Sequence, residues 1–287
     1  MCDFGARMLK PALVALFVFG LISRGVAFST EPAQIPFRFA DGFIRVEVQL
    51  NSSSKPLSML LDSGASVSVL NLTTARRLHL ETGKPRGVRG VTADAQAYGI
   101  EPLSAMISGI KCGFIALAAD MSRADELCSG PVDGLIGVDF FRNRIVQIDY
   151  SKQCIRLLTD SSTPAASQRL PVKVINGLAC VGVGVNGSSP RWTRLDTGCN
   201  DSLHWVVPKL ARSGTQSSAS IGFVTDALDL APSRVALGTL AVDSVPVALH
   251  GRPFFDGEAG LLGNGLLSRF TVTLDWNGKS LILKERR

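Results

Sequence analysis

The sequence contains few charged residues and few aromatic residues. Charged side chains make up 19% of the 287 residues, aromatic side chains make up 7%, and only two tyrosines are present. The 30 basic residues exceed the 24 acidic ones by six, but they do not gather into long runs, so nothing indicates a nucleic-acid-binding chain. Hydrophobic residues reach 46%. This content excludes a disordered chain, because disorder goes with low hydrophobicity and high net charge.

Sequence signatures of metal sites and of serine hydrolases are also missing. The histidines, His79, His204 and His250, are scattered, and neither a His-Glu-x-x-His nor a Cys-x-x-Cys spacing occurs. A zinc site would usually show such a spacing, and no Gly-x-Ser-x-Gly is present. We therefore expect no metal ion and no other cofactor. Cys199 lies only five residues before His204, whereas thiol-protease partners usually converge from distant parts of a chain, so we interpret it as a buried or leftover thiol.

Long hydrophobic runs are absent after the N-terminal segment. Residues 1–10 carry Arg7 and Lys10, residues 11–22 are all apolar, and Gly25-Val26-Ala27 follows. This order is typical of a signal peptide cleaved after Ala27. The alternative is a membrane anchor, but a helix of the apolar run would cover only about 18 Å of a hydrocarbon core of about 30 Å. We expect residues 1–27 to be a signal peptide and the protein to be secreted or periplasmic, without a stable membrane anchor.

Export permits disulfides. Cys2 leaves with the signal peptide, and an odd number of cysteines remains: Cys112, Cys128, Cys154, Cys180 and Cys199. The odd number predicts at least one unpaired thiol beside up to two bridges. The sequence does not choose among the pairings.

The chain contains an internal repeat. Asp62-Ser63-Gly64 recurs 134 residues later as Asp196-Thr197-Gly198, and each copy ends the second of two strands predicted by alternating apolar residues. Downstream, residues 133–137 match residues 259–263 at a spacing of 126, which continues to the end of the chain. Two diverged copies of one unit therefore occupy roughly residues 37–158 and 171–286.

Short strands separated by glycine and proline dominate both copies, which indicates an all-β fold with two lobes. The segment between the copies is small, polar and proline-containing, as in a linker. We predict an N-terminal lobe at residues 28–160, a linker at 161–170 and a C-terminal lobe at 171–287.

Two related lobes place equivalent residues face to face across a pseudo-twofold axis. This arrangement would bring Asp62 and Asp196 together. Two carboxyl groups that close do not both ionise easily, so they share one proton. One can then act as a general base on a water molecule while the other donates a proton to a carbonyl oxygen.

Asp62-Ser63-Gly64-Ala65-Ser66 and Asp196-Thr197-Gly198 resemble the active-site motifs of the aspartic proteases, both pepsin-like and retropepsin-like. Gly134-Leu135-Ile136-Gly137 and Gly260-Leu261-Leu262-Gly263 resemble the segment that threads behind each catalytic turn in that family. The resemblance covers both lobes. The Asp-Ser-Gly-Ala-Ser form is closest to retropepsin-like bacterial proteins, here as a single-chain, bilobal member.

The resemblance implies a bilobal acid-protease fold, with two homologous β-barrel-like lobes and the active site between them. It implies an aspartic endopeptidase with Asp62 and Asp196 as catalytic residues and Ser63, Gly64, Thr197 and Gly198 as supports of the catalytic loops. The hydroxyl groups of Ser63 and Thr197 match the positions that cross-link those loops. We expect a polypeptide substrate, no nucleic-acid partner and a monomer.

The second motif departs from the family pattern. Cys199 and Asn200 follow Gly198, where serine or threonine is usual, and Ala65 follows the first glycine. The alternative to an active protease is therefore a catalytically inactive relative that binds peptides in the cleft between the lobes. The family also covers its substrate with a β-hairpin from the first lobe, and residues 83–100 are the candidate here.

Overall fold

The computed structural model describes residues 33–89, 94–159, 168–207, 216–220, 223–229 and 232–286. All of them belong to one compact unit, Pro32–Arg287. The expected signal peptide lies outside the described residues, and its prediction stays a prediction. Within the part of the chain that is described, no helix is long and apolar enough to cross a membrane.

The first lobe is built on an eight-stranded sheet with the order β2-β3-β4-β9-β5-β8-β7-β6. Its strands are β2 (Arg38–Ala40), β3 (Phe43–Leu50), β4 (Leu57–Leu61), β5 (Val69–Asn71), β6 (Pro85–Arg89), β7 (Asp94–Ile107), β8 (Ile110–Ala119) and β9 (Gly134–Ile136). Its short helices are α1 (Leu72–Arg77), α2 (Ser122–Leu127) and the 3-10 helix η1 (Val138–Phe140).

The second lobe repeats this layout within a larger sheet, in which the path β13-β14-β21-β15-β20-β17-β16 is the counterpart of β3-β4-β9-β5-β8-β7-β6. Its strands are β13 (Leu178–Val185), β14 (Arg191–Leu195), β15 (Leu203–Val206), β16 (Gln216–Ser220), β17 (Phe223–Asp229), β18 (Ser233–Leu237), β19 (Leu240–Val245), β20 (Val247–His250) and β21 (Gly260–Leu262). Helix α3 (Asn264–Leu267) follows β21.

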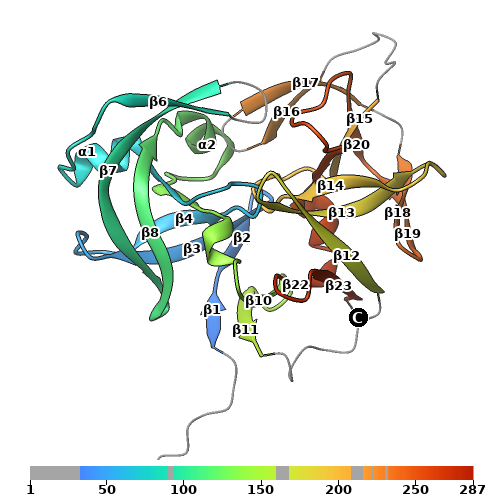
Figure 1. Cartoon of the computed structure of the whole chain (residues 1–287), viewed down its shortest axis with the longest axis horizontal. Helices are drawn as coiled ribbons and strands as arrows, with labels where there is room; N and C mark the ends of the chain where they lie inside the picture. The colour runs from blue at the N-terminus through green and yellow to red at the C-terminus, as the bar shows by residue number, and fades with distance from the viewer. Residues whose placement is uncertain are drawn as a thin grey trace, which may run out of the picture. The chain divides into compact units, whose positions relative to one another are not determined.

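Six strands join the lobes as one antiparallel run with the order β1-β11-β10-β22-β23-β12 (Figure 1). They are β1 (Gln34–Pro36), β10 (Ile145–Asp149), β11 (Cys154–Leu158), β12 (Gln168–Ile175), β22 (Phe270–Asp275) and β23 (Ser280–Glu285). At the middle of this run Gln147 lies opposite Thr273. These two residues are equivalent in the internal repeat, so the pseudo-twofold axis passes between them.

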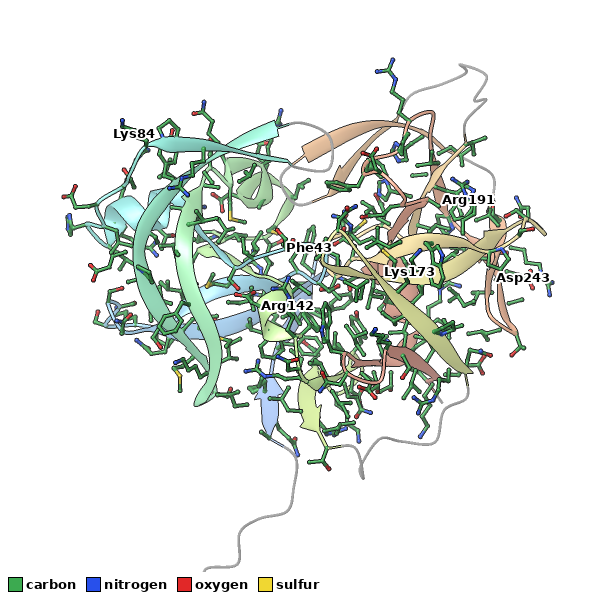
Figure 2. All side chains as sticks on the ribbon, in the orientation of Figure 1. Phe43, Lys84, Arg142, Lys173, Arg191 and Asp243 are labelled. Carbon is green, nitrogen blue, oxygen red and sulfur yellow. The ribbon has the colours of Figure 1, made fainter. Side chains whose placement is uncertain are left out.

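Period-two burial explains why these segments form strands. In β3 the side chains of Val46, Val48 and Leu50 are buried, whereas Glu47 and Gln49 between them are exposed. Such alternation fits a strand with one face on a core and the other toward solvent. Phe43, at the start of β3, is fully buried and lies near the middle of the view in Figure 2, while Lys84 and Asp243 lie near opposite outer edges.

The fold confirms the prediction of an all-β chain with two lobes. One bound differs from the expectation: residues 168–170 of the predicted linker 161–170 form the start of β12, because Gln168, Arg169 and Leu170 pair with β23. Residues 161–167 lie outside the described residues.

The described cysteines differ from the disulfide expectation. All five, from Cys112 to Cys199, are buried free thiols. A bridge requires Cβ atoms about 3.8 Å apart, and Cys112 and Cys128, for example, pack in two different hydrophobic clusters.

Candidate active site

Asp62 and Asp196 occupy equivalent turns at the ends of β4 and β14. In each lobe the strand that ends at the aspartate turn pairs with a parallel neighbour from further along the chain. β9 runs parallel to β4, and β21 runs parallel to β14. The backbone N–H of Asp62 donates to Ile136 O at 2.8 Å, and that of Asp196 donates to Leu262 O at 3.0 Å. Both aspartate turns are therefore held by the apolar-apolar-Gly segments that the sequence repeat singled out.

The two carboxyl groups meet at the lobe boundary. The side chains of Asp62 and Asp196 lie close enough to perturb each other's ionisation, and both residues are buried, with 7% and 4% of their surface exposed. A Cβ atom added to Gly64 would lie 2.5 Å from the carboxyl carbon of Asp196, and one added to Gly198 would lie 2.4 Å from that of Asp62. Glycine after each Asp-Ser/Thr pair is what lets each turn approach the opposite carboxyl group.

Backbone N–H groups orient each carboxyl group within its own turn. Gly64 N and Ala65 N donate to Asp62 Oδ1 at 2.8 Å and 3.0 Å, and Gly198 N donates to Asp196 Oδ1 at 2.9 Å. Hydrogen bonds of this kind fix the rotation of a carboxylate and stabilise its ionised form.

Ser63 and Thr197 cross-link the two turns beneath the carboxyl groups. Ser63 N donates to Thr197 Oγ1 at 2.9 Å, and Thr197 N donates to Ser63 Oγ at 3.0 Å. The two hydroxyl groups then donate across the boundary, Ser63 Oγ to Leu195 O and Thr197 Oγ1 to Leu61 O, both at 2.8 Å. This reciprocal pattern is the cross-link that the resemblance implies for these two positions.

A further buried amide ties the second turn to both lobes. Asn264 Nδ2 donates to Gly42 O at 2.8 Å and to Thr197 O at 2.7 Å, and Asn264 Oδ1 accepts from Tyr150 OH at 2.8 Å. Asn264 is fully buried. Because a buried amide that lost these partners would be costly, this network favours one relative position of the two turns.

Burial raises the pKa of the Asp62 carboxyl well above its usual value, and the neighbouring Asp196 carboxylate raises it further. Burial also raises the pKa of Asp196, while the Arg194 guanidinium and the Gly198 N–H act in the opposite direction. Two buried carboxyl groups this close share one proton. Burial and the neighbouring carboxylate favour the protonated form of Asp62, and Arg194 and the Gly198 N–H favour the ionised form of Asp196.

Arg194 is a site residue that the sequence analysis missed. Its side chain is 4% exposed and makes a bidentate ion pair with Glu258, from Nε at 2.7 Å and Nη2 at 2.8 Å. The remaining nitrogen, Nη1, donates across the lobe boundary to Gly64 O at 3.1 Å, and the ring of Phe255 stacks on the guanidinium at 3.7 Å. Arg194 therefore connects the second lobe to the first aspartate turn and places a fixed positive charge near both carboxyl groups.

The first lobe has apolar residues at the positions equivalent to this ion pair. The repeat counterparts of Arg194 and Glu258 in the first lobe are Leu60 and Val132, which pack together in an apolar cluster. A signal was present in the sequence, because Arg194 is a charged residue two positions before Asp196, where the repeat counterpart in the first lobe is Leu60. Its partner Glu258 is 64 residues away, and no motif in the sequence around Glu258 indicates the pairing.

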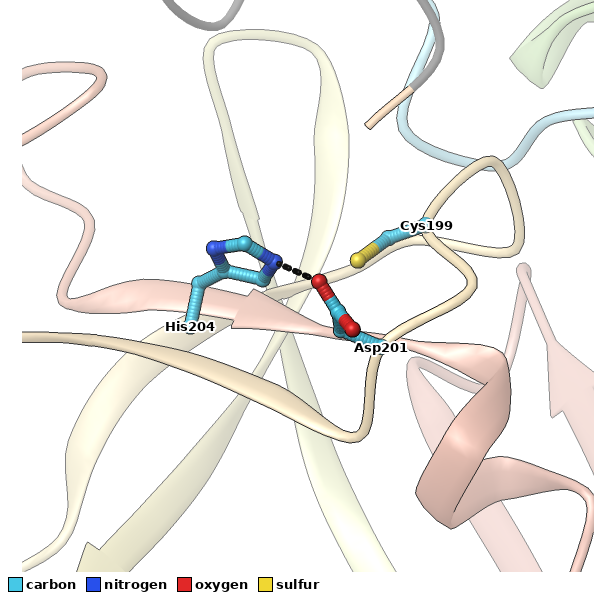
Figure 3. A group of neighbouring side chains, drawn as sticks. All are labelled: Cys199, Asp201 and His204. Atoms are coloured by element: carbon cyan, nitrogen blue, oxygen red, sulfur yellow. Dashed lines mark hydrogen bonds and ion pairs between the residues drawn. The ribbon is translucent and has the colours of Figure 1, made fainter. Parts of the chain in front are cut away.

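Cys199 and His204 also come together, with Asp201 between them. The side chains of Cys199 and His204 are fully buried, and one ligand-capable atom from each of the three residues lies within 4.8 Å of the others. His204 Nε2 lies 2.9 Å from Asp201 Oδ2, and His204 Nδ1 lies 2.8 Å from His250 Nε2. Figure 3 shows the thiol, the carboxylate and the imidazole pointing toward one another.

The candidate hairpin of the first lobe is present. β6 and β7 pair antiparallel from Pro85 opposite Tyr98 to Arg89 opposite Asp94, and residues 90–93 lie outside the described residues. The second lobe contains the repeat counterpart, β16 paired antiparallel with β17. The hairpin at residues 83–100 is thus confirmed, and its use as a substrate cover stays a prediction.

Comparison with known families gives one match. Residues 46–140 match the family model described as Aspartyl protease. A search of curated proteins finds no match. The match covers the first aspartate turn and the β9 segment behind it. It supports an aspartic protease family, and so a hydrolase that acts on peptide bonds in general terms.

Proposed function

We propose that this chain is an exported aspartic endopeptidase that hydrolyses peptide bonds with water activated by Asp62 and Asp196. The observation that carries the proposal is the pair of buried carboxyl groups, which come from equivalent turns and each face the glycine of the opposite turn. The family match at residues 46–140 supports the same class of activity for the first lobe.

The electrostatics of the pair support a division of roles. Asp196, whose anion is stabilised by Arg194 and the Gly198 N–H, acts as the general base and takes a proton from water as the water oxygen attacks the scissile carbonyl carbon. Asp62, whose pKa is raised by burial and by the neighbouring Asp196 carboxylate, donates a proton to the carbonyl oxygen. The resulting tetrahedral gem-diol is neutral at its oxygens, so the step develops no free oxyanion.

Collapse of the intermediate reverses the proton flow. Asp196 now carries the proton taken from water and donates it to the leaving amide nitrogen, while Asp62 recovers a proton from a gem-diol hydroxyl as the C–N bond breaks. The pair finishes with one proton, as it began. The cross-link of Ser63 with Thr197 and the Arg194 bond to Gly64 O keep the two turns at a constant separation through this cycle.

The test is cleavage of an unfolded protein by the purified chain, with new termini located by mass spectrometry. We expect internal cleavage that a statine-type transition-state mimic blocks, because its hydroxyl group takes the place of the attacking water between the carboxyl groups. Tight binding of peptides without cleavage would instead favour the inactive, peptide-binding alternative suggested by Cys199-Asn200.

Export is part of the proposal and has its own test. The basic residues Arg7 and Lys10, the apolar run 11–22 and the small residues before position 28 support cleavage after Ala27. N-terminal sequencing of material recovered outside the cytoplasm should begin at Phe28. An intact N-terminus in a membrane fraction would contradict the export part of the proposal without affecting the proposed chemistry.

A further inference from the structure

The turn that follows Asp196 brings three different metal-ligand types together. Cys199 supplies a thiol, Asp201 a carboxylate and His204 an imidazole, and their ligand atoms lie within 4.8 Å of one another (Figure 3). The proposed peptidase chemistry uses none of the three side chains. Along the sequence they form a short Cys-x-Asp-x-x-His segment, which does not match the spacings searched for above. The turn after Asp196 and the start of β15 nevertheless point the three side chains toward one another.

The distances suit a small tetrahedral cation. Zinc binds sulfur at about 2.3 Å and nitrogen or oxygen at about 2.0–2.2 Å, so neighbouring ligand atoms in a tetrahedral site lie roughly 3.3–3.8 Å apart. The three atoms here need to move by at most about 1 Å to reach that spacing. The Nε2–Oδ2 contact between His204 and Asp201, now 2.9 Å, would open slightly to admit the ion.

The surroundings contain the second partner that a metal-binding histidine requires. His204 Nδ1 lies 2.8 Å from His250 Nε2, and the two rings stack with their centroids 5.0 Å apart. A ligating histidine almost always donates its other ring N–H to a neighbouring acceptor, which fixes the tautomer and the ring orientation. His250 is positioned to accept that N–H and leave Nε2 of His204 free to bind a cation.

One ligand gives the site a route to solvent. The Cys199 and His204 side chains are closed off, whereas the Asp201 side chain is 41% exposed. A cation would reach the buried sulfur and nitrogen past this carboxylate. Three protein ligands would leave the fourth position of a tetrahedral zinc ion to a water molecule, whereas closed structural sites use four protein ligands.

We propose that Cys199, Asp201 and His204 form a binding site for one divalent transition-metal ion of the zinc class. On binding, the thiol of Cys199 loses its proton to solvent as the sulfur–metal bond forms, and the hydrogen bond between Asp201 and His204 is exchanged for two metal bonds. His204 Nε2 gives its proton to solvent, Nδ1 takes the proton of His250 Nε2 along the bond between the two rings, and His250 recovers a proton from solvent at its other nitrogen. No oxidant or reductant is needed. The mixed sulfur, nitrogen and oxygen set favours zinc-like ions over magnesium or calcium, which prefer all-oxygen sites.

The test is titration of the full chain with Co²⁺, with thiols kept reduced by a reductant that does not chelate metals. Cobalt can take the place of zinc, and its absorption spectrum shows which ligand types bind it and in which geometry. We expect one Co²⁺ per chain, a sulfur-to-cobalt charge-transfer band in the near ultraviolet, and the intense visible bands of a tetrahedral site. Zinc should displace the cobalt and remove these bands, and saturating Zn²⁺ should raise the melting temperature by several degrees, because it binds only the folded chain.

Three variants locate the site. Cys199→Ser should abolish the charge-transfer band, and Asp201→Ala, at a partly exposed position that tolerates truncation, should weaken Co²⁺ binding at least about tenfold. Cys112→Ser is the matched control, since Cys112 is an equally buried free thiol in the first lobe, and it should bind like the wild type. The proposal is overturned if the wild type shows no charge-transfer band, if the band survives Cys199→Ser, or if Cys112→Ser removes it. None of these readouts depends on peptidase activity.

Discussion

Replacing the Arg194–Glu258 ion pair by the apolar pair found in the first lobe separates the electrostatic role of Arg194 from its structural role. Arg194→Leu with Glu258→Val reproduces Leu60 and Val132, which occupy the equivalent positions of the repeat. The double variant removes the bidentate ion pair and the Nη1 bond to Gly64 O. It leaves no unpaired charge behind, whereas Arg194→Leu alone strands a carboxylate that is 2% exposed.

The stability effects of the single and double variants should therefore differ sharply. Breaking a buried ion pair by removing one partner costs about 3–5 kcal/mol, whereas replacing both partners by apolar residues is often neutral or stabilising. For a chain of this size each kcal/mol lowers the melting temperature by roughly 2–4 °C. Arg194→Leu should consequently melt about 6–20 °C lower than the wild type. The double variant should recover most of that loss.

The activity of the double variant should change in its pH dependence. The Arg194 guanidinium lowers the pKa of both carboxyl groups, most strongly that of Asp196. Its removal raises the pKa of the general base, so a higher pH is needed to ionise it. The acid limb of the kcat/KM profile should move upward by about one pH unit or more, since an opposite charge nearby lowers the pKa of a carboxyl group by about 1–3 units.

The assay is kcat/KM against pH for the wild type, Arg194→Leu and the double variant, with a chelator present so that bound metal does not contribute charge. Melting curves at each pH supply the control for folding. A loss of kcat with an unmoved acid limb would show that Arg194 only holds the Gly64 turn in place. A double variant that stays as unstable as Arg194→Leu would refute the argument that the unpaired Glu258 carboxylate causes the loss of stability in the single variant.

Three further changes test other parts of the site. Asp62→Asn should be more stable than the wild type at neutral pH, because the raised pKa of Asp62 makes its ionisation costly in the folded state. The difference in stability should grow as pH rises above 3.8, the usual pKa of the group. A melting-temperature difference independent of pH would contradict this. Gly64→Ala should lower kcat at least about 100-fold, because its Cβ would lie 2.5 Å from the Asp196 carboxyl group. Gly182→Ala, whose nearest neighbour would be 3.4 Å away, is the control and should keep its activity. Thr197→Val should cost about 2–4 kcal/mol in urea unfolding, since it leaves a buried N–H and a buried carbonyl unpaired; a loss below about 0.5 kcal/mol would show that the cross-link carries little stability.

The sequence predicted the parts of this structure that depend on local pattern and on the repeat. Alternating apolar and polar residues marked strands such as β3, and the recurrence of Asp62-Ser63-Gly64 as Asp196-Thr197-Gly198 predicted that the two turns would face each other. Equivalent residues of two lobes related by a pseudo-twofold axis meet where they lie close to that axis, as Gln147 and Thr273 do and as the two aspartate turns do.

Features that join residues with no shared pattern could not be predicted in this way. The partner of Arg194 is 64 residues away on a loop, and only the packed fold brings Glu258 to it. The thiol of Cys199 faces Asp201 and His204 because of the tight turn after Asp196, which no spacing rule describes. The five cysteines gave an odd count but no geometry, and only the fold shows that all five are free thiols.

The most direct test of the central claim is hydrolysis of one unfolded protein substrate by the wild type, Asp62→Asn and Asp196→Asn, each verified as a folded monomer at the assay concentration. The pair shares one proton, and neither carboxyl group can perform both proton transfers. The account predicts cleavage by the wild type and a loss of at least about 1,000-fold in each variant, with little further loss when both are combined, because the two residues act as one unit. Near-wild-type cleavage by monomeric Asp196→Asn would contradict it.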